Sequence, residues 1–188
     1  MKKIITKDAT FELEIKKSKF ISLSFLLKHK KNFEFLLNSV KNEHKNATHI
    51  VYAVCFSLEN CKFSDANEPK GSAGRQIFQI LQRKKLINSL IMVIRYLNGG
   101  KLGLGLLQNS YKKAAQEVIK LSKIADFTSF YSYKINTKIK NFNFILQLIK
   151  KNNCKIIKKQ FSETVEIEFE CQTKLDKTFG FDFFEIKK

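Results

Sequence analysis

Residues 63–111 constrain this chain most, because most of the residues with special backbone properties are gathered there. The stretch contains the only proline, six of the seven glycines and all three arginines. Elsewhere the basic residues are lysines. An arginine beside glycines therefore indicates that the planar hydrogen-bonding geometry of the guanidinium matters here, as well as its charge. A tight turn or a solvated surface explains any single one of these residues. The cluster as a whole favours a binding site.

The composition is that of a folded protein with one or two domains. The chain has 188 residues, of which 44% are hydrophobic and 18 are phenylalanine. The first residues are basic but lead into an alternating, charged segment, so they do not have the pattern of a signal peptide. No run approaches the roughly 18 apolar residues of a membrane-spanning helix. We therefore expect a cytoplasmic protein with no membrane partner.

The four cysteines, at 55, 61, 154 and 171, include no C-x-x-C pair, and the three histidines are scattered. This spacing predicts buried free thiols rather than disulfides, and it predicts no metal site and no cofactor.

The formal net charge is +18, and it is concentrated in the first two thirds of the chain. Residues 1–125 carry 23 basic and 9 acidic side chains, whereas residues 126–188 carry 12 and 8. A positive field of this size attracts nucleic acid. The alternative is a solvated surface produced by lysine-rich coding.

The hydrophobic periodicity predicts an N-terminal domain over 1–122. The expected elements are strands at 10–15 and 19–26, a helix at 31–45, strands at 48–56 and 62–63, a helix at 74–84, a strand at 89–95 and a helix at 107–120. The run at 89–95 is continuously apolar, as in a strand covered on both faces or buried at mid-sheet. Strand 48–56, helix 74–84 and strand 89–95 are interpreted as a β-α-β unit, with a right-handed crossover if the strands are parallel. The prediction is a two-layer α/β domain.

A smaller α+β domain is predicted over 129–188, after a junction at 122–129. Its expected elements are a strand at 131–137, a helix at 141–151, strands at 154–160 and 163–170, and a short helix and last strand in the tail. This order is the ferredoxin-like split β-α-β plan.

Two glycine-rich loops each lead into a predicted helix, whose first amides have no partner within the helix and attract anions. In the first loop Gly71 and Gly74 would let an anion approach, and Ser72 and Arg75 would bind it. In the second loop Gly103 and Gly105 would do the same. Arg95 and Lys101 would converge on the same anion if both loops lie at one edge of the sheet.

The acidic residues Asp65 and Glu68 suggest acid-base catalysis, but loop carboxylates more often cap a helix or hold an arginine. We therefore predict no catalytic residue, and we expect Glu68 to pair with Arg75 or Arg95.

Several motifs resemble the IMPACT/YigZ family: KSKFI at 17–21, ATH at 47–49, FSD at 63–65, EPKGSAGR at 68–75 and RYLNGGKLGLG at 95–105, followed by Tyr111. The resemblance covers the chain through about residue 120. It implies an N-terminal domain similar to the second domain of a small-subunit ribosomal protein, and a C-terminal domain similar to one in elongation factor G. Leu104 and Asn109 stand where the family usually has Thr and Arg, which weakens a phosphate site on the second loop.

The resemblance implies a role linked to translation, and with the positive charge it favours a non-enzymatic protein that binds RNA or the ribosome and regulates translation. A protein-interaction module in translation control, and an enzyme acting on a small anionic metabolite, are the alternatives. The predicted anion or nucleic-acid site consists of Gly71, Ser72, Gly74, Arg75, Arg95, Tyr96, Gly99, Lys101, Gly103 and Gly105, supported by Asp65, Glu68 and His49.

Overall fold

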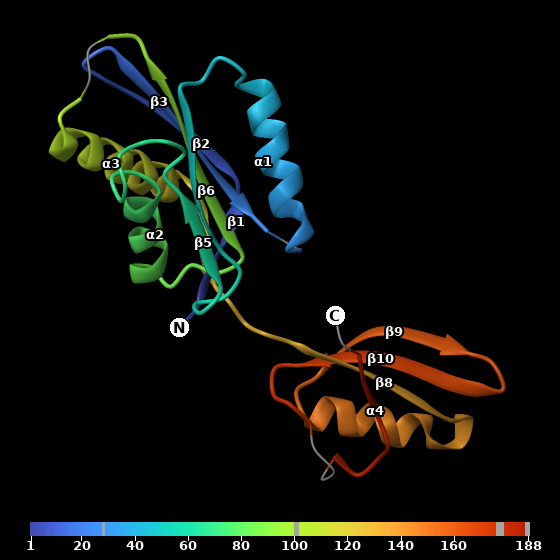
Figure 1. Cartoon of the computed structure of the whole chain (residues 1–188). Coiled ribbons are helices and arrows are strands. Elements are labelled where there is room, and N and C mark those ends of the chain that lie inside the picture. Colours follow the sequence, from blue (N-terminus) through green and yellow to red (C-terminus); the bar gives the residue numbers. More distant parts are fainter. Residues whose placement is uncertain (28, 100–101, 176–178, 187–188) are drawn as a thin grey trace. The chain divides into compact units, whose positions relative to one another are not determined.

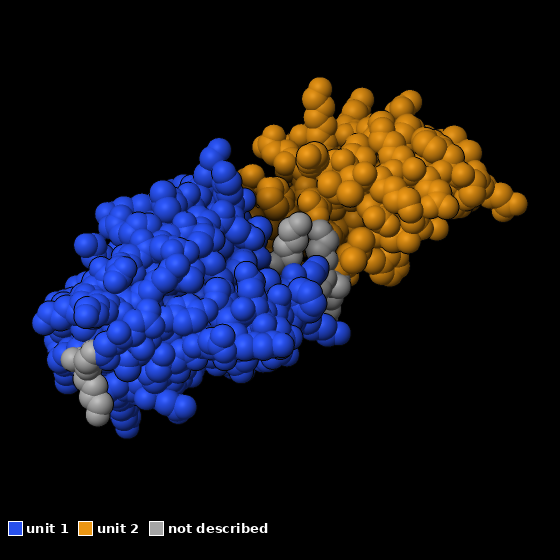
Figure 2. All heavy atoms as spheres, turned by 90° about the horizontal axis from the view of Figure 1, so that it is seen from above, with its two compact units in different colours: residues 1–127 blue, residues 128–188 orange. Residues whose placement is uncertain are grey.

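The structure is a computed structural model that describes residues 1–27, 29–99, 102–175 and 179–186. The chain divides into two compact units, Met1–Phe127 and Thr128–Lys188 (Figure 2). The described residues form four α-helices and three antiparallel sheets, so the chain is an α+β protein. None of the described helices is both long and apolar enough to cross a membrane.

Unit 1 is built on a five-stranded sheet with the strand order β2-β3-β6-β4-β5, in which every neighbouring pair is antiparallel (Figure 1). The strands are β2 (Ala9–Ile15), β3 (Ser18–Leu26), β4 (His49–Cys55), β5 (Cys61–Ser64) and β6 (Ser89–Leu97). Lys16 and Lys17 turn the chain between β2 and β3 with φ of 46° and 63°. The antiparallel pair expected from the sequence is therefore confirmed.

Helices cover both faces of this sheet. The helices of unit 1 are α1 (Lys31–Glu43), α2 (Gly74–Arg83) and α3 (Leu104–Leu121). Leu90, Met92 and Ile94 of β6 share a core with α1, whereas Ile91 and Val93 share one with α2 and α3. This explains why the β6 sequence is apolar without alternation. The expected two-layer arrangement is wrong, because α1 lies on the opposite face from α2 and α3 and makes a third layer (Figure 1).

The predicted β-α-β unit also needs correction. β4 and β6 are adjacent but antiparallel, since β5 forms a hairpin with β4 before α2 begins. β5 and β6 therefore run in the same direction on either side of β4. The predicted β-α-β unit ran directly from β4 into α2. In the structure β5 first reverses the direction of the chain, so β6 returns antiparallel to β4.

A second, two-stranded sheet joins the beginning of unit 1 to its end. β1 (Lys3–Lys7) pairs antiparallel with β7 (Lys123–Asp126), and Ile5 of β1 is fully buried in the core shared with α2 and α3. The expected junction at 122–129 thus contains a strand of unit 1. The first compact unit extends through Phe127, just after β7.

Unit 2 has a four-stranded antiparallel sheet with the order β11-β8-β10-β9. Its elements are β8 (Tyr131–Lys138), a 3-10 turn at Ile139–Asn141, α4 (Phe142–Lys151), β9 (Lys155–Phe161), β10 (Thr164–Cys171) and β11 (Phe184–Ile186). β10 lies between β8 and β9, which is the split β-α-β connection that the sequence predicts. The expected tail helix falls partly on residues 176–178, which lie outside the described residues.

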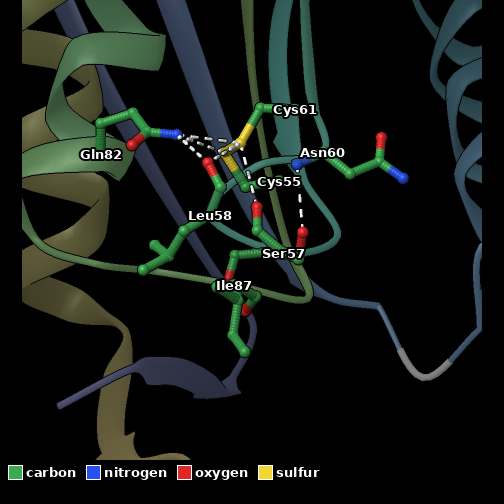
Figure 3. Close-up of a disulfide and its surroundings, with 8 residues drawn as sticks. Cys55, Ser57, Leu58, Asn60, Cys61, Gln82 and Ile87 are labelled. Carbon is green, nitrogen blue, oxygen red and sulfur yellow. Dashed lines mark hydrogen bonds between the residues drawn. A yellow bond between two sulfur atoms is a disulfide. The ribbon is translucent and has the colours of Figure 1, made fainter.

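Both cysteine pairs form disulfides, so the expectation of free thiols is wrong. Cys55 and Cys61 are direct partners in the β4–β5 register and are bridged (Figure 3). Beside this bridge, the Gln82 side chain of α2 donates a hydrogen bond to the Leu58 carbonyl at 2.9 Å. Cys154 is bridged to Cys171 in unit 2. Sequence spacing does not reveal either pair, because the antiparallel strands bring the cysteines together.

Candidate functional site

The loop between β5 and α2 is organised by the carboxylate of Asp65. This carboxylate accepts hydrogen bonds from the amides of Gly71 at 2.8 Å, Ala73 at 3.1 Å and Gly74 at 2.7 Å. Gly71 has a φ of +76°, and a side chain at Gly74 would collide with the backbone of Ser64. The glycines therefore let the loop close on its own carboxylate. The expectation that these amides are open to an external anion is wrong.

Ser72 is also used within the loop. It is fully buried, and its hydroxyl donates to the Pro69 carbonyl at 2.6 Å. The Ser72 amide donates to the same carbonyl at 3.0 Å. Ser72 therefore stabilises a tight turn, and its predicted contact with a phosphate is not what the geometry favours.

Arg95 forms a buried ion pair with Glu68. Its side chain is about as buried as that of Glu68, with exposed fractions of 5% and 4%, and its Nη1 lies 2.8 Å from Glu68 Oε1. Nη2 donates to the Ser18 hydroxyl at 3.3 Å, and the guanidinium lies over the Phe20 ring at 5.5 Å. The predicted pairing of Glu68 with an arginine is confirmed. The predicted contact of Arg95 with phosphate is wrong, because the guanidinium is enclosed by the fold.

Tyr111 and His49 complete this buried cluster. The Tyr111 hydroxyl donates to Glu68 Oε1 at 2.7 Å. Burial, followed by the hydrogen bond to Glu68 and the charge of that carboxylate, raises the pKa of Tyr111 well above its ordinary value. His49 Nε2 lies 3.8 Å from Glu68 Oε1, and Nδ1 lies 2.8 Å from the Ala66 carbonyl. The cluster thus ties β4, the first loop, β6 and α3 together.

The two glycine-rich loops lie at the same end of the sheet, as expected. This follows because β5 and β6, which lead into them, are both antiparallel to β4. The second loop nevertheless adds little to an anion site. The Tyr96 hydroxyl lies 2.8 Å from His44 Nδ1, beside α1 and away from the first loop. Lys101 lies outside the described residues.

Gly99, Gly103 and Gly105, the described glycines of the second loop, are exposed. A side chain at Gly99 would meet Lys17 of the neighbouring turn, whereas Gly103 and Gly105 have open space around them. None of the described contacts brings these three glycines to Arg75. The predicted site is therefore divided: Gly71, Ser72, Gly74, Arg75 and Arg95 lie in or beside the loop at 65–73, whereas Tyr96 lies beside α1.

Arg75 lines a pocket of about 370 Å³ beside the first turn of α2. The other lining residues are Phe63, Asp65, Lys70 and Gly71. Phe63 is 43% exposed and stacks on Phe78 of α2, with 5.4 Å between ring centroids and 23° between the planes. The pocket thus combines an exposed aromatic ring with two exposed cationic side chains. The charge of Asp65 is offset by three amides at the positive end of α2.

The sequence analysis did not identify Phe63 and Lys70, which line this pocket, or Phe78, which packs against Phe63. The sequence contains one signal for them: Phe63 lies in a short apolar segment directly before the first glycine-rich loop. Phe78 follows Arg75 by three residues, a spacing that makes the two side chains neighbours on the surface of a helix.

Comparison with known proteins covers nearly the whole chain. Residues 16–119 match the family model described as the Impact N-terminal domain. The chain is 28% identical to IMPACT family member YvyE of Bacillus subtilis, over 90% of this chain and 79% of that protein. It is 27% identical to IMPACT family member YigZ of Escherichia coli, over 81% and 76%. A crystal structure of a hypothetical protein aligns with a TM-score of 0.68 and 24% identity, over 91% and 86%.

Proposed function

Since this chain belongs to the IMPACT family, we propose that it is a non-enzymatic, cytoplasmic protein that binds single-stranded RNA, free or exposed on the ribosome, and thereby regulates translation. The binding site in this proposal is the pocket beside α2. The observation that carries it is the exposed ring of Phe63, stacked on Phe78 and flanked by Lys70 and Arg75.

An unpaired base can stack on an exposed aromatic ring, and adjacent cations attract its phosphates. Phe63 is held for this role, because its ring packs on Phe78 and its strand pairs with β4, where Phe63 is opposite Ala53. Such a site accepts many sequences, since every base has a flat face. The formal charge of +18 supports the same class of ligand through long-range attraction.

The finer fold assignments are part of this proposal. We assign unit 1 to the fold of the ribosomal-protein second domain and unit 2 to the ferredoxin-like fold of a translation factor. The strand order β11-β8-β10-β9, with β10 between β8 and β9, supports the second assignment.

The test is binding of a fluorescently labelled oligouridylate to the full chain, measured by anisotropy. Phe63→Ala is expected to weaken binding by about 1–3 kcal/mol, the usual contribution of stacking on one base. Phe35→Ala is the matched control, because Phe35 is 73% exposed but lies on α1, across the sheet from the pocket. Equal losses in both variants would contradict a specific aromatic site.

A second comparison separates the pocket from diffuse charge. Lys70→Ala combined with Arg75→Ala should weaken RNA binding more than Lys2→Ala combined with Lys3→Ala, although both pairs remove two charges. The logarithm of affinity should fall linearly with that of salt concentration, with a slope of roughly −0.7 per phosphate contacted. The slope should become shallower only in the first double variant. Equal changes would show that net charge alone attracts the RNA.

A further inference from the structure

A groove of about 570 Å³ lies in unit 2 between helix α4 and strand β9. Its lining residues are Leu146, Ile149, Lys150, Asn153, Cys154, Ile156 and Lys159. The floor is aliphatic, and two lysines contribute to the rim. Unlike the pocket of unit 1, the lining includes no aromatic ring. It therefore suits branched aliphatic side chains better than a nucleic-acid base.

The segment that forms this groove is strongly basic. Residues 139–162 contain six lysines and no acidic residue. Lys150, Lys155, Lys158 and Lys159 are exposed, and no ion pair between described residues involves them. An occupant that carries carboxylates would therefore meet exposed positive charge, above all at the groove lysines Lys150 and Lys159.

Strand β9 also has an open edge. It is the last strand in the order β11-β8-β10-β9, and six of its seven residues are exposed. The backbone groups on that edge have no strand partner within the described sheet. Such an edge can accept an extended segment from another protein, which adds a strand to the sheet.

The other edge of β9 shows which sequence fits. There β9 pairs with β10, which alternates apolar residues with Glu166, Glu168 and Glu170. The apolar residues of β10 are buried on the face covered by α4, and its glutamates lie on the opposite face. In the register, Glu168 is opposite Lys158 and Glu170 is opposite Lys155. One side of β9 thus already holds an acidic, alternating strand.

We propose that the groove between α4 and β9 binds an extended, acidic segment of a partner protein, which pairs with the open edge of β9. Its apolar side chains enter the groove floored by Leu146, Ile149 and Ile156. Its carboxylates lie on the other face of the sheet, beside Lys155 and Lys158. This interaction is separate from RNA binding by unit 1.

The test uses the full chain and a fluorescently labelled peptide, TVEIEFE, which copies residues 164–170. The expected result is saturable binding, measured by anisotropy, and no binding of the charge-reversed peptide TVKIKFK. Lys155→Gln combined with Lys158→Gln should weaken binding roughly tenfold. Lys41→Gln combined with Lys45→Gln, on and just after α1, is the control with the same change in charge. Equal losses in the two double variants would overturn the proposal.

Strand pairing is tested by methylating alternate backbone nitrogens of the peptide. This change leaves every charge in place but removes the hydrogen bonds to the edge of β9, so binding should be lost in one of the two methylation registers. Retained binding in both registers would overturn the proposal. A different result would also overturn it: oligouridylate displaces the peptide, and the Lys155→Gln, Lys158→Gln variant no longer binds oligouridylate. The groove would then be an RNA site. The Lys70→Ala, Arg75→Ala variant should bind the peptide as the unaltered chain does.

Discussion

Arg95 and Arg75 stand close to the same loop, yet their surroundings give them opposite uses. Arg95 is enclosed, and its guanidinium is held by Glu68 and Ser18 over the ring of Phe20. Arg75 is exposed on the first turn of α2, in a pocket with Phe63 and Lys70. The comparison teaches that one loop does two jobs. Its buried side fixes the fold, and its outer side carries the exposed groups of the proposed RNA site.

The largest expected effect comes from breaking the buried side. Glu68→Ala leaves the Arg95 guanidinium buried without its carboxylate, which should destabilise unit 1 by about 3–5 kcal/mol. The measurement is urea unfolding followed by circular dichroism. Glu117→Ala, which removes the partner of exposed Lys120, should cost at most about 1 kcal/mol. If both variants lose the same stability, the Arg95 pair is not the structural centre described above.

The next effect concerns the carboxylate that joins the two sides. Asp65→Ala removes the acceptor for three amides and should cost about 2 kcal/mol. Hydrogen exchange should show the loss locally, at the amides of Gly71, Ala73 and Gly74. If those amides stay protected from exchange, the loop closes without Asp65.

A smaller effect is expected at Tyr111, with a defined pH dependence. Tyr111→Phe keeps the ring but removes the hydrogen bond to Glu68, which should cost about 1 kcal/mol at pH 7. Burial, and then Glu68, raise the pKa of Tyr111 above its ordinary value of 10.0. Above pH 10 the folded chain therefore holds a proton that the unfolded chain releases.

The stability that comes from this raised pKa is complete below pH 10. It falls by about 1.4 kcal/mol for each further pH unit. The difference in unfolding free energy between the wild type and Tyr111→Phe should therefore shrink between pH 10 and 11. A difference that stays constant across this range would contradict the raised pKa.

The smallest effect on stability is expected on the outer side of the loop. Arg75→Ala should change the unfolding free energy by less than about 0.5 kcal/mol, because the side chain is exposed. It should nevertheless weaken RNA binding. Arg83→Ala, at the other end of the same helix, is the control and should leave RNA binding unchanged. A large stability loss for Arg75→Ala would remove the distinction between the two arginines.

Local patterns in the sequence predicted the elements of the fold but not all of their relations. The alternation at 10–15, the apolar run at 89–95 and the helical spacing after Gly74 each correspond to an element. The direction of β6 relative to β4 was missed, because β5 has only four residues yet reverses the chain. The pairing of β1 with β7 was missed because it joins the two ends of unit 1. Such contacts leave no local signal.

The candidate site was predicted only in part, because part of it also depends on contacts between residues far apart in the sequence. Charge and glycine content located the loop at 65–73, and loop chemistry correctly suggested that Glu68 would hold an arginine. Burial decides which arginine is held and which is free, and burial depends on tertiary packing. The aromatic pair of Phe63 and Phe78 joins a strand to a helix, so only the fold brings the two rings together.

The pairing of β1 with β7 also has a consequence for synthesis and for dissection of the chain. During translation the first strand emerges long before its partner, so Ile5 must wait until residue 126 has left the ribosome before this small sheet can close. A fragment that stops at residue 122 would lack β7, so β1 would have no strand to pair with. A fragment that extends through Phe127 would keep both strands of this sheet. It is therefore the fragment of unit 1 suited to independent expression.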